Sequence, residues 1–207
     1  RPMNCARNAT PRFRDLVSTP RPDLPPPRRG RRSLGPDWLR ERLERLCVPP
    51  ARRRLLLAFS GGLDSTVLLH LLATLRDAGP RPDRDAARWQ LRAVYVNHHL
   101  QPDADRWAQR CRAQCRALGV PFSLRHVRLQ PDRGESLEAA ARDARYAVLG
   151  AMLRRDEVLV TAHHEDDQFE TLLLQLMRGA GLAGLSAMPE FARFGNAWLA
   201  RPLLTVE

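Results

Sequence analysis

The sequence contains no lysine, so each of its 34 basic residues is arginine. This absence excludes a Walker A phosphate-binding loop, because that motif ends in Gly-Lys-Ser/Thr. It also excludes catalysis by a lysine amine of this chain, whether as a nucleophile or as a Schiff base. Cationic contacts with phosphate or RNA therefore rest on arginine.

Cysteines and long apolar runs are also scarce. The four cysteines include only one close pair, Cys111 and Cys115, whose C-x3-C spacing matches neither a zinc ribbon nor a redox C-x-x-C motif, so we expect reduced thiols. No stretch approaches the roughly 18 apolar residues of a membrane-spanning helix, and the first residues contain no apolar signal core. We expect a cytoplasmic protein with no membrane partner, and the sequence leaves its oligomeric state open.

Residues 1–33 differ in composition from the rest of the chain. They hold nine arginines against Asp15 and Asp23, so about seven of the eleven net positive charges lie there. A segment so rich in arginine and proline cannot bury enough apolar surface to order itself. We expect a disordered tail over 1–33 and one folded domain over 34–207.

Short apolar segments alternate with amphipathic segments through the folded domain. The patterns predict strands over 54–59, 91–97, 121–129 and 157–161, and helices over 37–47, 65–75, 104–118, 136–154 and 166–178. Such alternation is typical of an α/β fold, here an open, mainly parallel, twisted sheet of Rossmann-like type with helices on both faces. Its ligand site should lie at the carboxyl ends of the strands.

The first predicted strand leads into residues 60–65, S-G-G-L-D-S, where a helix begins. Gly61 and Gly62 permit a tight turn that brings backbone N–H groups against phosphate oxygens, and the hydroxyls of Ser60 and Ser65 add donors. The predicted cradle consists of Ser60, Gly61, Gly62, Leu63, Asp64 and Ser65, with Asn97 from the end of the second strand.

Asp64 would repel a polyphosphate unless a divalent cation lay between them. We therefore predict that Asp64 is a catalytic residue and a Mg²⁺ ligand, with ATP as the nucleotide. The alternative is an ordinary glycine turn in which Asp64 and Ser65 cap the helix.

A second cluster follows the fourth predicted strand. Asp167 and Glu170 lie three residues apart on one helix face and are suited to bind a cationic amine. His163 is placed to orient or deprotonate that amine, or to contact a substrate base. We expect His164 to be structural and Asp166 to be either a helix cap or a functional group; a transition-metal site here lacks a closed ligand set.

Arginines on two further segments are candidates for substrate binding. Arg142 and Arg145 lie on one face of the long helix over 136–154, and Arg178 precedes a glycine-rich turn. These guanidinium groups could clamp a phosphate group or the backbone of a nucleic acid. The alternatives are a solvated Glu138–Arg142 pair and a plain helix stop.

Taken in order, these motifs resemble the N-type ATP pyrophosphatases of the PP-loop superfamily, whose fold is that of the adenine nucleotide alpha hydrolases. More narrowly, they are similar to the N-terminal catalytic domain of the tRNA(Ile)-lysidine synthetases. The resemblance rests on residues 60–65 and on 96–100 (VNHHL), 138–146 (EAAARDARY), 161–171 (TAHHEDDQFET), 178–185 (RGAGLAGL) and 201–204 (RPLL).

The resemblance implies a two-step reaction. ATP would adenylate the C2 oxygen of the wobble cytidine in tRNA(Ile) with a CAU anticodon, and the ε-amine of L-lysine would then displace AMP to give lysidine. It implies catalytic roles for Asp64, His163, Asp167 and Glu170, with Asp167 and Glu170 recognising lysine.

Two other functions stay open at this point. A PP-loop tRNA thiolase activates a base in the same way, but such enzymes usually need C-x-x-C cysteines, which the sequence lacks. A non-catalytic nucleotide-binding module would not require Asp64 or the HHEDDQFE segment. The family also continues into tRNA-binding regions beyond the position of Glu207, so we expect a truncated catalytic core.

Overall fold

The computed structural model describes residues 34–46, 53–79, 88–129, 134, 136–177, 179 and 187–206, together with the backbone of 17–20. Within these residues seven strands form a single sheet in the order β1-β6-β7-β5-β2-β3-β4. The strands are β1 (Val17–Pro20), β2 (Arg54–Ala58), β3 (Gln90–Asn97), β4 (Phe122–His126), β5 (Glu157–Val160), β6 (Phe191–Phe194) and β7 (Ala197–Ala200).

The predicted α/β class is confirmed. Strands β2, β3, β4, β5 and β7 run parallel, and β6 pairs antiparallel with both β7 and β1. The helices are α2 (Pro36–Leu46), α3 (Leu63–Asp77), α4 (Ala104–Ala117), α5 (Leu137–Met152) and α6 (Glu165–Met177). None of these described helices has the length and apolar character needed to cross a bilayer.

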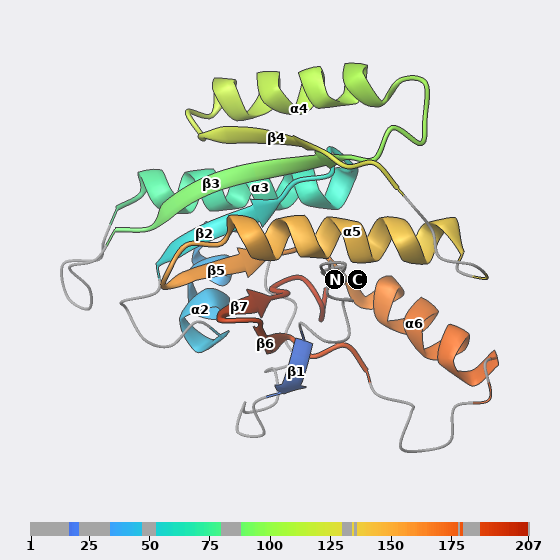
Figure 1. Cartoon of the computed structure of the whole chain (residues 1–207). Helices are drawn as coiled ribbons and strands as arrows, with labels where there is room; N and C mark the ends of the chain where they lie inside the picture. The colour runs from blue at the N-terminus through green and yellow to red at the C-terminus, as the bar shows by residue number, and fades with distance from the viewer. Residues whose placement is uncertain are drawn as a thin grey trace, which may run out of the picture.

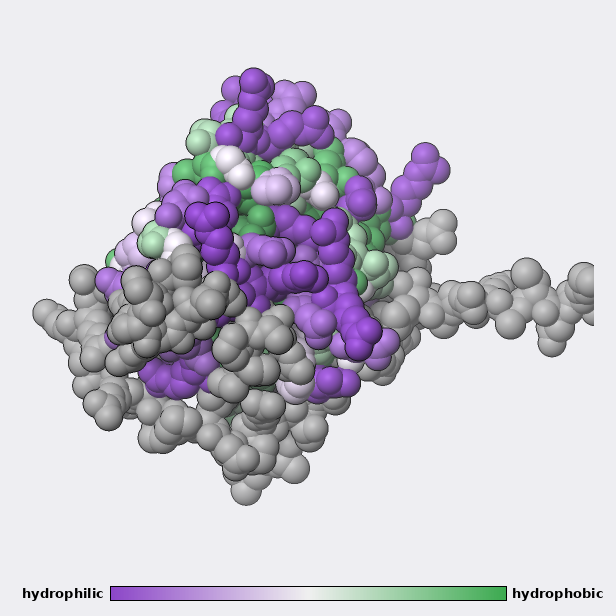
Figure 2. All heavy atoms as spheres, turned by 90° about the vertical axis from the view of Figure 1, so that its left-hand side faces the viewer, coloured by the Kyte–Doolittle hydropathy of each residue, from purple (hydrophilic) through white to green (hydrophobic). Residues whose placement is uncertain are grey.

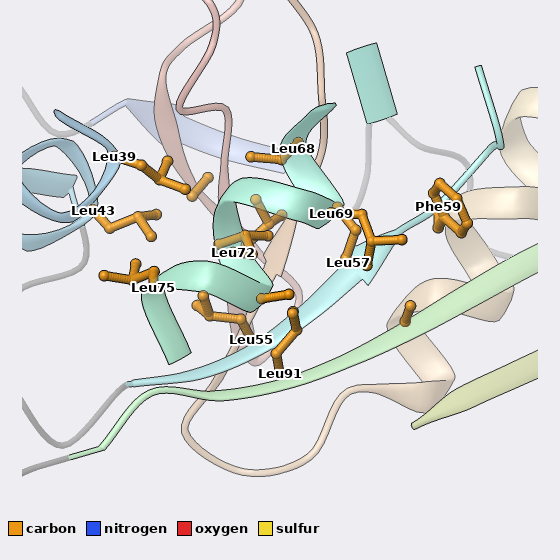
Figure 3. Packing of buried hydrophobic residues seen from close by; sticks show 14 of the residues in the cluster. Leu39, Leu43, Leu55, Leu57, Phe59, Leu68, Leu69, Leu72, Leu75 and Leu91 are labelled. Atoms are coloured by element: carbon orange, nitrogen blue, oxygen red, sulfur yellow. The ribbon is translucent and has the colours of Figure 1, made fainter. Parts of the chain in front are cut away.

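The core lies on both faces of the sheet, as an apolar run such as Leu55, Leu56 and Leu57 requires. Leu55 and Leu57 belong to a cluster with α2 and α3, whereas Leu56 faces the opposite side with Tyr146 of α5. Helix α5 therefore covers one face of the sheet, and α2, α3 and α4 pack on the other (Figure 1). Figure 3 shows the second of these layers around Leu39, Leu43, Leu68, Leu69, Leu72 and Leu75.

Three strands were not predicted. Strands β6 and β7 form a hairpin across a two-residue turn, where Gly195 has φ +56° and is followed by Asn196. A Gly-Asn pair between two apolar runs is a hairpin signal, so the sequence did carry this information. Strand β1 lies inside the tail expected to be disordered, and it pairs Val17 with Phe194. The rest of 1–33 lies outside the described residues, and the division of the chain at residue 33 stays a prediction.

The order of the strands fixes where a ligand can bind. The chain proceeds from β2 through α3 to β3 and then to β4, but β5 returns through α5 to the other side of β2. Since α3 and α5 cover opposite faces, a crevice opens at the carboxyl ends of β2 and β5. Figure 2 shows the opposite side of the molecule, at the amino ends of these strands, where hydrophilic residues cover most of the described surface.

Candidate functional site

The turn after β2 is held by its own hydroxyl groups. The Ser60 and Ser65 hydroxyl oxygens lie 3.0 Å apart, and the Ser65 hydroxyl donates to the Gly62 carbonyl oxygen over 3.0 Å. The Thr66 hydroxyl donates to the same carbonyl oxygen at 2.8 Å. These contacts tie the turn over 60–65 to the first turn of α3.

The first turn of α3 presents free backbone donors. Its N-cap is Gly62, and no side chain caps it. The alternative in which Asp64 and Ser65 cap the helix is therefore not what the structure contains. Uncapped N–H groups and the positive end of the helix dipole together form an anion site, which suits a phosphate group.

Gly61 is required by its conformation and by its surroundings. Its φ is +79°, in the left-handed region, and a Cβ atom there would lie 2.6 Å from the Cys111 sulfur of α4. Cys111 is itself fully buried. The turn thus rests directly on α4, and a side chain at position 61 has no room.

A cavity of about 280 Å³ opens beside this turn. Residues from β2, β3, α5 and the segment after β5 line it: Ala58, Phe59, Ser60, Ser65, Val94, Tyr95, Val96, His98, Arg145, Tyr146, Leu149, Thr161, Ala162 and His163. Most of the wall is apolar, and the polar groups converge from three sides. Such a cavity beside an anion site is suited to a nucleoside attached to phosphates.

His163 is a neutral imidazole in this environment. Its Nδ1 lies 2.8 Å from the Thr161 hydroxyl oxygen, which fixes the orientation of the ring. Burial is the largest cause of a lowered pKa at His163. Together with the charges of Arg201, Arg145 and Arg142 and a smaller effect of His164, it lowers the pKa of His163 to about 3. A group that binds a proton so weakly is better suited to orient a base or an amine through a hydrogen bond than to accept its proton.

His164 lies among carboxylates. Its Nε2 is 3.7 Å from a carboxylate oxygen of Asp64 and 3.7 Å from one of Asp167, and its Nδ1 is 3.8 Å from Asp166. The Asp167 carboxylate also accepts the His164 backbone N–H at 2.9 Å. His164 therefore lies between the first turn of α3 and the first turn of α6, and the structural role expected for it stays a prediction.

The acidic candidates form one side of the site. Asp64 is about half exposed, with 51% of its side chain accessible, and it stands at the uncapped end of α3. One carboxylate plus the phosphates of a nucleotide is a usual ligand set for Mg²⁺, so Asp64 fits this ion. Asp167 uses one oxygen as a helix cap, and Glu170 follows it on the same face of α6, exposed to solvent.

The basic candidates lie on the other side. Arg145 lines the cavity, and Arg142 is one turn away on α5, close enough for its charge to influence His163. Arg178 lies outside the described residues.

Asn97 has a different position from the one expected. Only 1% of it is exposed, and it does not line the cavity. Its side-chain amide donates to Asp105 at 2.8 Å and accepts the backbone N–H of His99 at 2.8 Å. Asn97 thus holds the turn after β3 rather than contacting the cavity, because both ends of its amide are engaged within the protein.

Sequence reasoning did not single out two residues of the site. His98 lines the cavity, and its Nδ1 is buried with no hydrogen-bond partner among the described residues. Arg201 is fully buried and donates to the Pro189 carbonyl oxygen at 2.7 Å. Among the neighbouring charges, that of Arg201 has the largest effect on the pKa of His163. His98 lies in the run VNHHL and Arg201 in the run RPLL. Both runs contributed to the resemblance, but they did not indicate what either residue does.

Residues 37–207 match the family described as the PP-loop domain. The chain is 53% identical to a tRNA(Ile)-lysidine synthase of Alkalilimnicola ehrlichii over 71% of this chain and 31% of that protein. It is 54% identical to a tRNA(Ile)-lysidine synthase of Pseudomonas aeruginosa over 72% of this chain and 32% of that protein. The chain thus spans about a third of the length of the curated relatives it matches.

A solved structure shares the fold. The U34-tRNA thiolase NcsA from Methanococcus maripaludis, solved with its [4Fe-4S] cluster, superposes with a TM-score of 0.61 over 83% of this chain and 59% of that chain. The sequence identity is 15%, so this likeness concerns the arrangement of strands and helices alone.

We predict that Gly61→Ala disrupts the turn after β2, whereas Gly79→Ala is tolerated. Both glycines have positive φ, so both substitutions should cost about 1–2 kcal/mol of backbone strain. Only at Gly61 does the new Cβ meet another atom, the Cys111 sulfur, whereas Gly79 has open space around it. Calorimetry with Mg-ATP should therefore show binding lost in Gly61→Ala and retained in Gly79→Ala.

The double variant Gly61→Ala/Cys111→Ala provides the matched control, because it removes the sulfur from the collision. It should bind ATP better than Gly61→Ala alone. Equal binding in the two variants would show that the contact with α4 does not shape the turn.

We predict that His163 makes stability depend on pH in mildly acidic solution. In the unfolded chain His163 takes up a proton near its ordinary pKa of 6.5, but in the folded chain only near 3, so stability is lost as the pH falls between these values. Between pH 6.5 and about 4.5 the wild type should lose on the order of 2 kcal/mol more unfolding free energy than His163→Gln. Urea unfolding at both pH values measures this, with exposed His70→Gln as the control expected to behave like the wild type.

Proposed function

Because the chain belongs to the PP-loop domain family, we propose that it activates a tRNA base with ATP and then joins L-lysine to that base. The base is the wobble cytidine of tRNA(Ile) with a CAU anticodon, and the product is lysidine. The main support is that β2 and β5 are hydrogen-bonded neighbours, so the phosphate turn and His163 line one cavity. Asp167 lies beside this cavity, because His164 is 3.7 Å from a carboxylate oxygen of Asp64 and 3.7 Å from one of Asp167. The high identity to tRNA(Ile)-lysidine synthases supports the choice of substrate.

In the first step the triphosphate lies along the turn over 60–65, with its oxygens against the uncapped N–H groups of α3. The cytidine O2 attacks the α-phosphorus, and pyrophosphate leaves. Mg²⁺ held by Asp64 would offset the charge of the departing pyrophosphate. Arg145, at the cavity wall, is placed to contact the α-phosphate or the tRNA backbone.

In the second step the lysine amine attacks C2 of the cytidine, and AMP departs with the former O2. Asp167 and Glu170 bind the ε-ammonium group. Glu170, which is exposed, accepts one proton from the ammonium and passes it to solvent, so that the amine nitrogen has a lone pair for the attack. His163 keeps the activated base in place as a neutral hydrogen-bond partner, since its pKa of about 3 leaves it unprotonated in neutral solution. The buried wall around His163 also keeps water from the adenylate.

This division of roles favours the ligase over a thiolase. A carboxylate pair on α6 complements a cationic amine. Within the described residues the cysteines are Cys111 and Cys115, both fully buried on α4 and raised in pKa by that burial, to about 11 and about 12. Thiols of this kind are poor carriers of sulfur at neutral pH.

We predict that Asp64→Asn keeps the fold and abolishes tRNA-dependent pyrophosphate release. The substitution removes the negative charge that we assign to Mg²⁺ binding. The fold should not depend on this charge, because the Asp64 side chain is half exposed. Asp77→Asn, at the far end of the same helix, is the control and should act like the wild type. Pyrophosphate release is measured with cognate tRNA, and the complete enzyme of a relative serves as the reference. Release by Asp64→Asn at the wild-type rate would overturn the assignment of Asp64 to Mg²⁺.

We also predict that Asp167→Asn and Glu170→Gln weaken the use of lysine while sparing ATP binding. A hydrogen bond to a charged group is worth about 1.5–3 kcal/mol, so the apparent KM for lysine should rise roughly tenfold to a hundredfold. Asparagine still accepts the His164 N–H, so Asp167→Asn should leave the start of α6 intact. Asp166→Asn, 90% exposed, is the matched control. An unchanged KM for lysine in both variants would contradict the proposed amine site.

A further inference from the structure

A second group of ligating side chains lies at the β4 edge of the sheet and does not line the nucleotide cavity. His99 follows β3, Asp105 lies in the first turn of α4, and His126 ends β4. The His99 Nε2 and the His126 Nδ1 are 2.8 Å apart, and one ligand atom from each of the three residues falls within 4.8 Å of the others. The two imidazole rings stack with their centroids 4.9 Å apart.

The positions of these three residues are set by the backbone of the fold and not by contacts between their own side chains. Parallel pairing of β3 with β4 sets Asn97 opposite His126, and the Val127 N–H donates to the Asn97 carbonyl oxygen at 2.9 Å. The chain then turns through His99 and enters α4, which returns Asp105 to the same edge. Backbone hydrogen bonds and helix packing therefore fix the three positions.

The buried side chain of Asn97 contacts two of the three residues, Asp105 and His99. Its buried amide donates to one oxygen of Asp105 and accepts the backbone N–H of His99, both at 2.8 Å. His99 is held at φ +54°, a left-handed conformation that costs an ordinary residue about 1–2 kcal/mol. A buried polar residue that orients ligand side chains is characteristic of metal sites in proteins.

We propose that His99, Asp105 and His126 bind a divalent transition-metal ion of the zinc class. The donors would be the His99 Nε2, the His126 Nδ1 and a carboxylate oxygen of Asp105. Two imidazole nitrogens with one carboxylate suit Zn²⁺, Co²⁺, Ni²⁺ or Cu²⁺, whereas Mg²⁺ prefers oxygen ligands. The site is thus chemically distinct from the Mg²⁺ position assigned to Asp64.

The ion would fasten the outer edge of the domain. It would join the ends of β3 and β4 to the start of α4, and so restrain the turn that carries His98 into the nucleotide cavity. Arg112 and Arg116 line the same groove between α4 and β4, and their charges oppose a bare cation. The carboxylate of Asp105 partly offsets this repulsion.

The test uses the full chain without a histidine tag, freed of metal with a chelator. Zn²⁺ is titrated by calorimetry in excess Mg²⁺, which saturates oxygen-only sites, and thermal unfolding is followed with and without Zn²⁺. We expect about one equivalent to bind and to raise the unfolding temperature. Co²⁺ should give a ligand-field spectrum without the sulfur charge-transfer absorption that thiolate ligands produce.

The variants separate this site from any other. His99→Gly deletes one ligand, and glycine adopts the positive φ of this position without strain, so the fold should survive. Both His99→Gly and His126→Gln should weaken Zn²⁺ binding by roughly tenfold or more. His70→Gln, an exposed histidine of α3, and Asp64→Asn should bind as the wild type does. The proposal is wrong if the wild type binds no Zn²⁺, if His99→Gly and His126→Gln bind it unchanged, if Asp64→Asn alone abolishes binding, or if Co²⁺ reports thiolate ligands.

Discussion

The site depends on the parallel pairing of β2 with β5. Four consecutive residue pairs, from Arg54 with Glu157 to Leu57 with Val160, hold the two strands in register and end them at the same edge. The chain leaves β2 into the phosphate turn and leaves β5 toward His163, so two segments about a hundred residues apart in sequence line one cavity. A slip in register by one residue would turn each side chain of these strands from one face of the sheet to the other, and so disrupt the packing of both apolar layers. Hydrophobic burial therefore fixes where the phosphate turn and His163 lie.

Two adjacent histidines divide the site by charge. His163 faces Arg142, Arg145 and Arg201, whose positive charges add to burial in lowering its pKa. His164 lies within 3.8 Å of carboxylates from both α3 and α6. The arginine side suits phosphates and RNA, and the carboxylate side suits a metal ion and an ammonium group. The proposed reaction, which uses a nucleotide polyanion and a cationic amine, would need both surfaces within one crevice.

Much of this arrangement could be predicted from the sequence. The order and type of the elements from β2 to α6 follow from apolar runs and helical spacing, and the phosphate turn follows from the two glycines after a buried strand. What the sequence alone could not provide depends on tertiary contacts. Asn97 has the same residue type whether it binds a ligand or, as here, supports a turn, and only its 1% exposure and its two hydrogen-bond partners decide between them. The influence of Arg201 on His163 likewise arises only once β7 is placed beside β5.

The position of the bound nucleotide can be measured in a crystal structure of the chain with Mg²⁺ and a non-hydrolysable ATP analogue. We expect the triphosphate against the backbone N–H groups of residues 61 to 65, the metal beside the Asp64 carboxylate, and the nucleoside in the cavity lined by Tyr95, His98 and Tyr146. A nucleotide bound elsewhere, such as in the groove between α4 and β4 lined by Arg112 and Arg116, would contradict this expectation.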